Sequence, residues 1–137
     1  MNGEDRPSGA LVLSTIGLAF HIAAFAVIII VATLLSGAVT SGFPSTGPGF
    51  MVAMLTWFLL WVVAGLIIVA LGVVGVSMMN SASVDRVRVG SVIILLVAIL
   101  GFPTFWGFVI GSLLMFVGAI LGLVWQPPHR LMPTPGP

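Results

Sequence analysis

Residues 50–79 read FMVAMLTWFLLWVVAGLIIVALGVVGVSMM and contain no charged side chain over 30 positions. About 20 apolar residues in an α-helix are enough to cross the hydrocarbon core of a bilayer, which is about 30 Å thick. The stretch is continuously apolar, whereas strands of a membrane barrel alternate, and a helix satisfies its own backbone groups in lipid. It therefore predicts a membrane-spanning helix that is longer than the hydrocarbon core and tilts or protrudes.

Three further apolar runs flank this segment. The third and fourth predicted helices end near Pro103 and Pro127, because proline disfavours a helical conformation in the residue before it. The sequence thus predicts an all-α fold, an integral membrane bundle of four transmembrane helices. The expected spans are residues 10–35, 50–79, 88–102 and 105–125.

The remaining segments are polar or rich in turn-forming residues. Residues 1–9 are expected to form a polar N-terminal segment before the transmembrane domain of residues 10–126. Residues 36–49 are dominated by Gly, Pro, Ser and Thr, which predicts an exposed loop. Residues 127–137 hold five prolines, so we expect an extended cytoplasmic tail.

The composition of the whole chain excludes several classes of protein. The 137 residues are 60% hydrophobic and only 5% charged, with a mean hydropathy of +1.32. Soluble domains carry roughly 25% charged residues. This excludes a soluble globular enzyme, a disordered chain and a protein that binds nucleic acid through a basic face. The chain has no cysteine, so thiolate nucleophiles and thiolate metal sites are excluded too.

The few charges predict how the chain is threaded through the membrane. With four spans, the N-terminal segment, the link between the second and third spans, and the tail lie on one side. All seven charged residues fall in these three segments. Arg86, Arg88 and Arg130 set the orientation, because basic residues favour the cytoplasmic side. We therefore expect a multi-pass protein of the cell membrane with both termini in the cytoplasm.

His21 is the titratable residue that the predicted spans place inside the membrane. It lies 11 residues into the first span, about 16 Å deep, and an ionisable group at this depth suggests a function. Ser14, Gly17, His21 and Ala24 share one helix face, and small or polar faces usually pack against other helices. One interpretation is a proton acceptor or cofactor ligand. The favoured one is a neutral imidazole that hydrogen-bonds a neighbouring helix.

Depth along the spans suggests two neighbours for His21. The indole N–H of Trp61 or the hydroxyl of Thr56 is expected near it, which would make an intramembrane polar site. Packing or lipid contact is the alternative for Trp61, and the sequence favours it. The spans contain no Asp or Glu to pair with His21. We predict no catalytic residue, no metal ligand and no cofactor.

Glycines on two spans predict close helix contacts. Those of the fourth span are spaced by 4, 7 and 4 residues and fall within an arc of roughly 60°. Glycine pairs of the GxxxG type let two helix backbones approach closely. The second span repeats the seven-residue step, and the contact is expected within the bundle or between protomers. These glycines are Gly107, Gly111, Gly118 and Gly122, with Gly65 and Gly72 on the second span.

Residues 88–128 read RVGSVIILLVAILGFPTFWGFVIGSLLMFVGAILGLVWQPP. This segment resembles the small four-helix membrane proteins of the DUF4064-like families. The likeness lies in Gly90, which opens the third span, in the turn after that span, and in the glycine-rich fourth span. The resemblance implies an integral membrane location and no particular activity or site residue.

These observations predict a protein that is not an enzyme, because nucleophile–base pairs, metal clusters and phosphate-binding loops do not appear in the sequence. We expect an accessory or assembly subunit of a membrane complex, or a self-associating helical bundle. Its expected partners are the lipid bilayer and other membrane subunits or further copies of the chain, but not nucleic acid. The alternatives are a small oligomeric transporter or channel that uses His21, and a holin-like membrane-remodelling protein.

Overall fold

The computed structural model describes residues 6–42, 47–102 and 108–126, which form four helices and, within these ranges, no strand. The all-α prediction is therefore confirmed. Two of the helices are long and apolar enough to cross a membrane, over Ser8–Gly37 and Val52–Met79. The helices are α1 (Ser8–Gly42), α2 (Pro48–Met79), α3 (Val84–Gly101) and α4 (Phe108–Val124).

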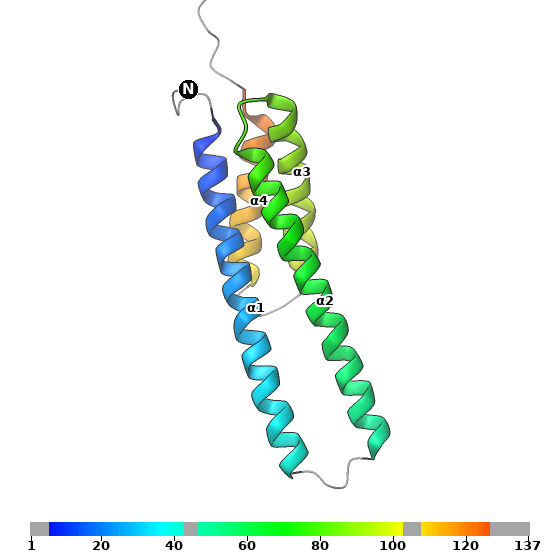
Figure 1. Cartoon of the computed structure of the whole chain (residues 1–137). Helices are drawn as coiled ribbons and strands as arrows, with labels where there is room; N and C mark the ends of the chain where they lie inside the picture. The colour runs from blue at the N-terminus through cyan, green and yellow to red at the C-terminus, as the bar shows by residue number, and fades with distance from the viewer. Residues whose placement is uncertain (1–5, 43–46, 103–107, 127–137) are drawn as a thin grey trace, which may run out of the picture.

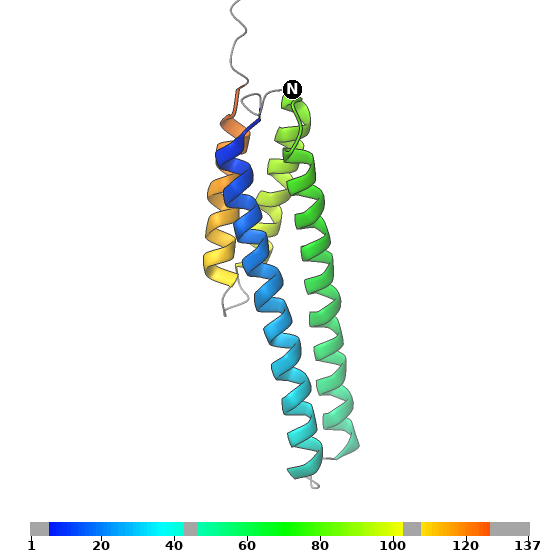
Figure 2. The ribbon, with the colours of Figure 1, turned by 60° about the vertical axis from the view of Figure 1, so that its left-hand side comes forward.

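The helices differ in length, and this difference shapes the molecule. α1 and α2 have 35 and 32 residues, whereas α3 and α4 have 18 and 17. At 1.5 Å per residue the first pair is about 50 Å long and the second about 26 Å. The start of α1, the α2–α3 link and the end of α4 lie at one end of the bundle (Figure 1). At the other end, α1 and α2 continue well beyond α3 and α4 (Figures 1 and 2).

The four helices form a ring in which each helix packs against its neighbours in the sequence and α1 packs against α4. α1 has its most extensive contact with α4, and α4 and α2 both pack against α3. The contact between α1 and α2 is the smallest of these four pairings. The first and last helices therefore close the ring, through the most extensive contact of the bundle.

The predicted loop over residues 36–49 is shorter than expected. α1 continues to Gly42, and α2 begins at Pro48. The hydroxyl of Thr33 donates to the carbonyl oxygen of Ile30 at 2.7 Å, and that of Ser36 to Thr33 at 2.8 Å. The helix thus satisfies these polar side chains with its own carbonyls. No proline interrupts it, because the next proline in the sequence is at position 44, after the helix has ended. Composition predicted a loop for residues 36–42, and this was wrong.

The other predicted boundaries are close to those of the structure. α3 begins at Val84, four residues before the predicted start, with Ser83 at its N-cap and Asp85 in its first turn. A carboxylate in that position interacts favourably with the helix dipole. α4 begins at Phe108, and the predicted start at residue 105 lies outside the described residues, as does the proline-rich tail.

The buried side chains are confined to the half of the bundle near the charged residues. Among the helix residues whose burial is described, the last buried one of α1 is His21, and the first of α2 is Gly72. On α3 the buried positions recur every three or four residues, as expected for one packed helix face. They are Val87, Gly90, Ser91, Ile94, Val97, Ala98 and Gly101. We call residues 26–37 of α1 and 52–64 of α2 the apolar arm; none of its residues is buried.

Glycines of α4 lie directly against the backbone of α1. A Cβ atom on Gly118 would lie 2.9 Å from the carbonyl oxygen of Ala10, and one on Gly111 would lie 2.9 Å from that of Gly17. Real Cβ atoms do not approach backbone so closely. These two glycines therefore set the distance between α1 and α4. Gly107 lies outside the described residues.

The remaining glycines lie in other contacts of the same chain. Gly122 of α4 faces Ser91 and Met79, while Gly65 and Gly72 of α2 face Phe25 and Leu18 of α1.

Two further glycines mark a crossing that spacing had not indicated. A Cβ atom on Gly90 would lie 2.6 Å from the carbonyl oxygen of Gly75, and one on Gly75 would lie 3.1 Å from that of Gly90. α2 and α3 therefore touch backbone to backbone at this pair.

We expect Gly118→Leu to destabilise the protein by about 1–3 kcal/mol, the usual range for overpacking. The added side chain meets the backbone of α1, which cannot move aside as a flexible side chain does. Ile110→Leu is the matched control, because Ile110 is 59% exposed on the same helix. Thermal unfolding in detergent, followed by circular dichroism, measures both variants. Equal stability of the two would contradict the glycine contact.

Candidate functional site: a buried histidine and an apolar cavity

His21 of α1 is completely buried where α1, α3 and α4 meet. Its Nδ1 lies 3.2 Å from the carbonyl oxygen of Gly17, and its Nε2 lies 3.3 Å from Oγ of Ser112 on α4. A carbonyl oxygen only accepts, so Nδ1 carries the proton and donates to Gly17. A neutral imidazole has one donor and one acceptor nitrogen. Nε2 therefore accepts the hydrogen bond of the Ser112 hydroxyl.

Two glycines make the space that the imidazole fills. A Cβ atom on Gly101, at the end of α3, would lie 2.5 Å from Nε2 of His21. A Cβ atom on Gly111 of α4 would lie 2.7 Å from Nδ1. Any larger residue at either position would collide with the ring. The site thus depends on residues from three helices, and Ser112 supplies a polar side-chain atom at the ring.

This geometry links helices and leaves no lone pair of the ring for a ligand. A metal or haem iron would need the lone pair of Nε2, which accepts the Ser112 hydrogen bond. Among the described residues there is also no group of three His, Asp or Glu side chains that would hold a metal ion. The arrangement is suited to hold α1 against α4 in one register.

The structure places the two predicted neighbours of His21 elsewhere. Thr56 lies in the apolar arm, and its hydroxyl donates to the carbonyl oxygen of Val52 at 2.8 Å. Trp61 lines an apolar cavity together with Gly101. The hydroxyl that meets His21 belongs to Ser112, which the sequence analysis had not singled out. Its signal was present, because Ser112 is the one hydroxyl residue of α4.

Two other buried serines lie in the same half of the bundle. Ser91 donates to the carbonyl oxygen of Val87 at 2.8 Å, within its own helix. The hydroxyl of Ser14 has no hydrogen-bond partner among the described residues, and it lies against Gly118. A small side chain is what this contact requires, so the serine serves close packing of α1 on α4.

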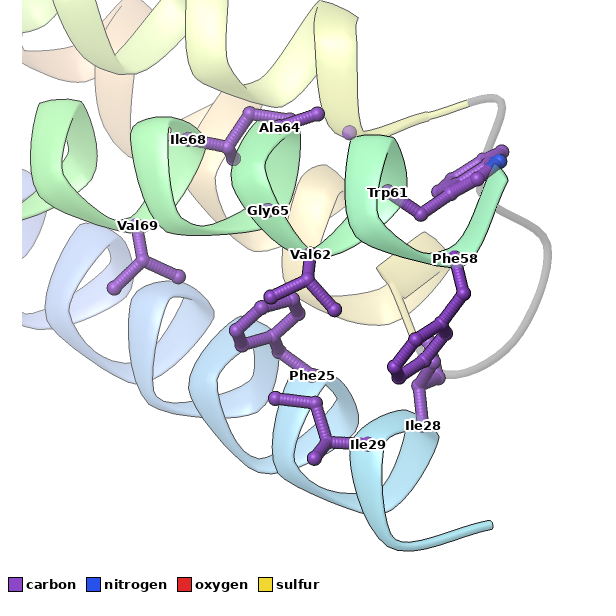
Figure 3. Close-up of a pocket in the computed structure, with 11 residues that line it drawn as sticks. Phe25, Ile28, Ile29, Phe58, Trp61, Val62, Ala64, Gly65, Ile68 and Val69 are labelled. Carbon is purple, nitrogen blue, oxygen red and sulfur yellow. The ribbon is translucent and has the colours of Figure 1, made fainter. Parts of the chain in front are cut away.

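An apolar cavity lies below the end of α3, between α1 and α2. We call it the sub-hairpin cavity, because it adjoins Gly101 at the end of α3, where the α3–α4 hairpin ends. Its volume is about 70 Å³. Phe25 and Val62 extend into the space between the two helices, and Phe58 lies near the end of the view where the helices diverge (Figure 3). Its lining includes Phe25, Ile29, Phe58, Trp61, Val62 and Gly101.

The charged residues that the structure describes gather at the opposite end. The guanidinium of Arg6 donates to Oδ1 of Asn80 at 2.9 Å, which joins the segment before α1 to the α2–α3 link. Arg86 and Arg88 are exposed on the first turns of α3. Arg130 lies outside the described residues.

No family model, curated protein or solved structure matches this chain. The His21 site, the sub-hairpin cavity and the apolar arm are therefore the features from which its function is inferred.

We expect Ser112→Ala to lower the free energy of unfolding by about 0.5–1.5 kcal/mol, because Nε2 of the buried His21 loses its donor. Combined with His21→Leu in a double-mutant cycle, it should show a coupling of about 0.6 kcal/mol, typical of hydrogen bonds between membrane helices. Thr56→Ala removes an exposed hydroxyl bonded to its own helix and should change nothing. Denaturant titration in micelles measures all variants, and additive losses would disprove the link.

Proposed function

We propose that this chain is a non-catalytic, multi-pass membrane protein that assembles with other membrane helices through its apolar arm. It acts as an accessory or assembly subunit, or it associates with further copies of itself. The observation that carries the proposal is the exposure of the arm: Leu34 is 70% exposed and Leu59 is 64% exposed. Exposed apolar surfaces of this extent mark sites of protein or membrane contact.

The distribution of charge supports a membrane location. Residues 7–84 contain no Asp, Glu, Lys or Arg, and Asp85, Arg86 and Arg88 follow at the start of α3. Arg6 lies at the same end of the bundle, because it bonds Asn80 of the α2–α3 link. One end of the bundle is thus basic, while the tip of α1 and α2 carries no charge. By the preference of arginine for the cytoplasmic side, the basic end faces the cytoplasm.

The helix lengths support a role for the arm. The part of α3 from Arg88 to Gly101 covers 13 residue steps, or about 20 Å along a helix. This length is shorter than a hydrocarbon core of about 30 Å. The uncharged run from Ala10 to Leu35 is about 39 Å long as a helix and exceeds that core. Tilting a helix shortens the distance that it spans across the bilayer. Both segments are shortened in this way, so no single thickness of the hydrocarbon core matches the apolar part of α3 and the uncharged run of α1. The arm therefore passes the end of α3 with much of its surface open to partner helices.

The alternative of a transporter or channel would give His21 a role in transport. The ring nitrogens of His21 are bonded to Gly17 and Ser112, an arrangement that favours a packing role for this residue. The assembly function is therefore the better supported of the two.

The membrane placement is tested with single cysteines, since the chain has none of its own. Ser83→Cys lies in the α2–α3 link and Gly47→Cys lies just before α2. In intact cells, a membrane-impermeant maleimide should label the cysteine at position 47 and spare the one at position 83. Labelling of both from outside, or of neither until the cells are lysed, would contradict the threading.

The arm is tested with a photo-crosslinking amino acid at Leu34 or at Leu59. Illumination of native membranes should give discrete protein adducts from both positions. Position Val92 on α3 is the control, because it is also exposed, at 46%, but lies outside the arm. An adduct at twice the mass of the 14.2 kDa chain would indicate self-association, and other masses a different subunit. Adducts from Val92 alone, or from none of the three positions, would contradict the proposal.

A further inference from the structure

We propose that the sub-hairpin cavity binds one acyl chain of a phospholipid from the leaflet opposite the arginines. The inference rests on the membrane placement proposed above, but not on assembly through the arm. Three properties of the cavity identify the occupant: the chemistry of its lining, the helix contact beside it and its depth.

The chemistry of the lining selects a hydrocarbon guest. The lining residues are Phe, Ile, Val, Ala, Gly and Trp61, so the indole nitrogen is the one polar side-chain atom among them. Apolar cavities of this kind stay dry and accept apolar guests. A headgroup, a sugar or a polar peptide would lose its hydrogen bonds to water here without replacement.

The contact between α1 and α2 beside the cavity excludes a partner helix from its interior. α1 and α2 touch each other beside it, because Gly65 lies against the ring of Phe25. A helix with its side chains is about 10 Å wide and does not fit between two helices in contact. Phe25, Val62 and Phe58 line the cavity from α1 and α2 (Figure 3), and its volume of about 70 Å³ suits a segment of one hydrocarbon chain.

The depth of the cavity identifies the leaflet. Gly101 borders the cavity and lies about 20 Å from Arg88 along α3, beyond the middle of a hydrocarbon core of about 30 Å. Between Gly101 and the far surface of the hydrocarbon core, about 10 Å of hydrocarbon remain. In this layer α1 and α2 continue beyond the end of α3 (Figure 1). Acyl chains of the far leaflet occupy that depth, and their ends reach the cavity without moving a headgroup into the core.

Native mass spectrometry of the full chain, purified in mild detergent with dioleoylphosphatidylcholine as the probe, tests the proposal. Wild type should retain one phospholipid. Ala64→Phe places a ring in the cavity, because Ala64 lines it, and should retain at least tenfold less. Ala70→Phe is the matched control, an exposed alanine of the same helix that is not among the lining residues. Equal retention by all three proteins, or none by wild type, would overturn the proposal.

A second measurement locates the lipid without filling the cavity. Two single-tryptophan proteins, one keeping Trp61 and the other Trp57, are reconstituted with phosphatidylcholine brominated on its acyl chains, which quenches nearby indoles. Trp57 is 66% exposed and does not line the cavity. After exchange into lipid-free detergent, Trp61 should stay quenched while Trp57 recovers. Equal recovery of both would show that the cavity holds no bound chain.

These outcomes are separable from those of the proposed function. Failure of the cysteine accessibility test removes the membrane placement and this inference with it. Failure of the crosslinks from Leu34 and Leu59 removes assembly through the arm and leaves the lipid site standing. A protein dimer with no bound lipid would support the arm as an interface between copies and overturn the lipid site.

Discussion

The close contact of α1 with α4 is the constraint on which the rest of the structure depends. Gly111 and Gly118 bring the backbone of α4 within van der Waals reach of Gly17 and Ala10 on α1. In a bilayer, helices gain little from burying apolar surface against each other, so close packing and interhelical hydrogen bonds stabilise their association. The His21–Ser112 bond has this character, because it forms only when the two backbones are this close.

The sequence predicted the helices better than their partners. Uninterrupted apolar runs and prolines located all four helices, because these signals are local. The seam of Ser14, Gly17 and His21 was also found, since a spacing of three and four residues marks one helix face. Ser112 stands out as the one hydroxyl residue of α4, but its position in the sequence does not show that it meets a histidine 91 residues away. Which helices pack together is decided by tertiary contacts, and spacing along one segment does not contain that information.

The end of α1 shows a second limit of local reasoning. Glycine, serine and threonine over residues 36–42 predicted a loop, yet the helix continues through them. Such residues lower helix propensity by no more than about 1 kcal/mol each, and the hydroxyl of Ser36 donates to the carbonyl oxygen of Thr33 within the same helix. The resulting extra turns lengthen α1 relative to α3. The difference in length that makes the apolar arm and the sub-hairpin cavity was therefore larger than the sequence indicated.

The pairing of α1 with α4 has a consequence for biosynthesis. α1 is made before the other three helices and has its most extensive contact with α4, the last of the four, so this contact forms only after α4 has been synthesised. Until then the imidazole of His21 lacks the Ser112 hydroxyl, and the seam of α1 formed by Ser14, Gly17 and His21 lacks the helix that buries it. A chain that terminates before residue 108 would lack α4 and would leave this polar face of α1 without its packing partner.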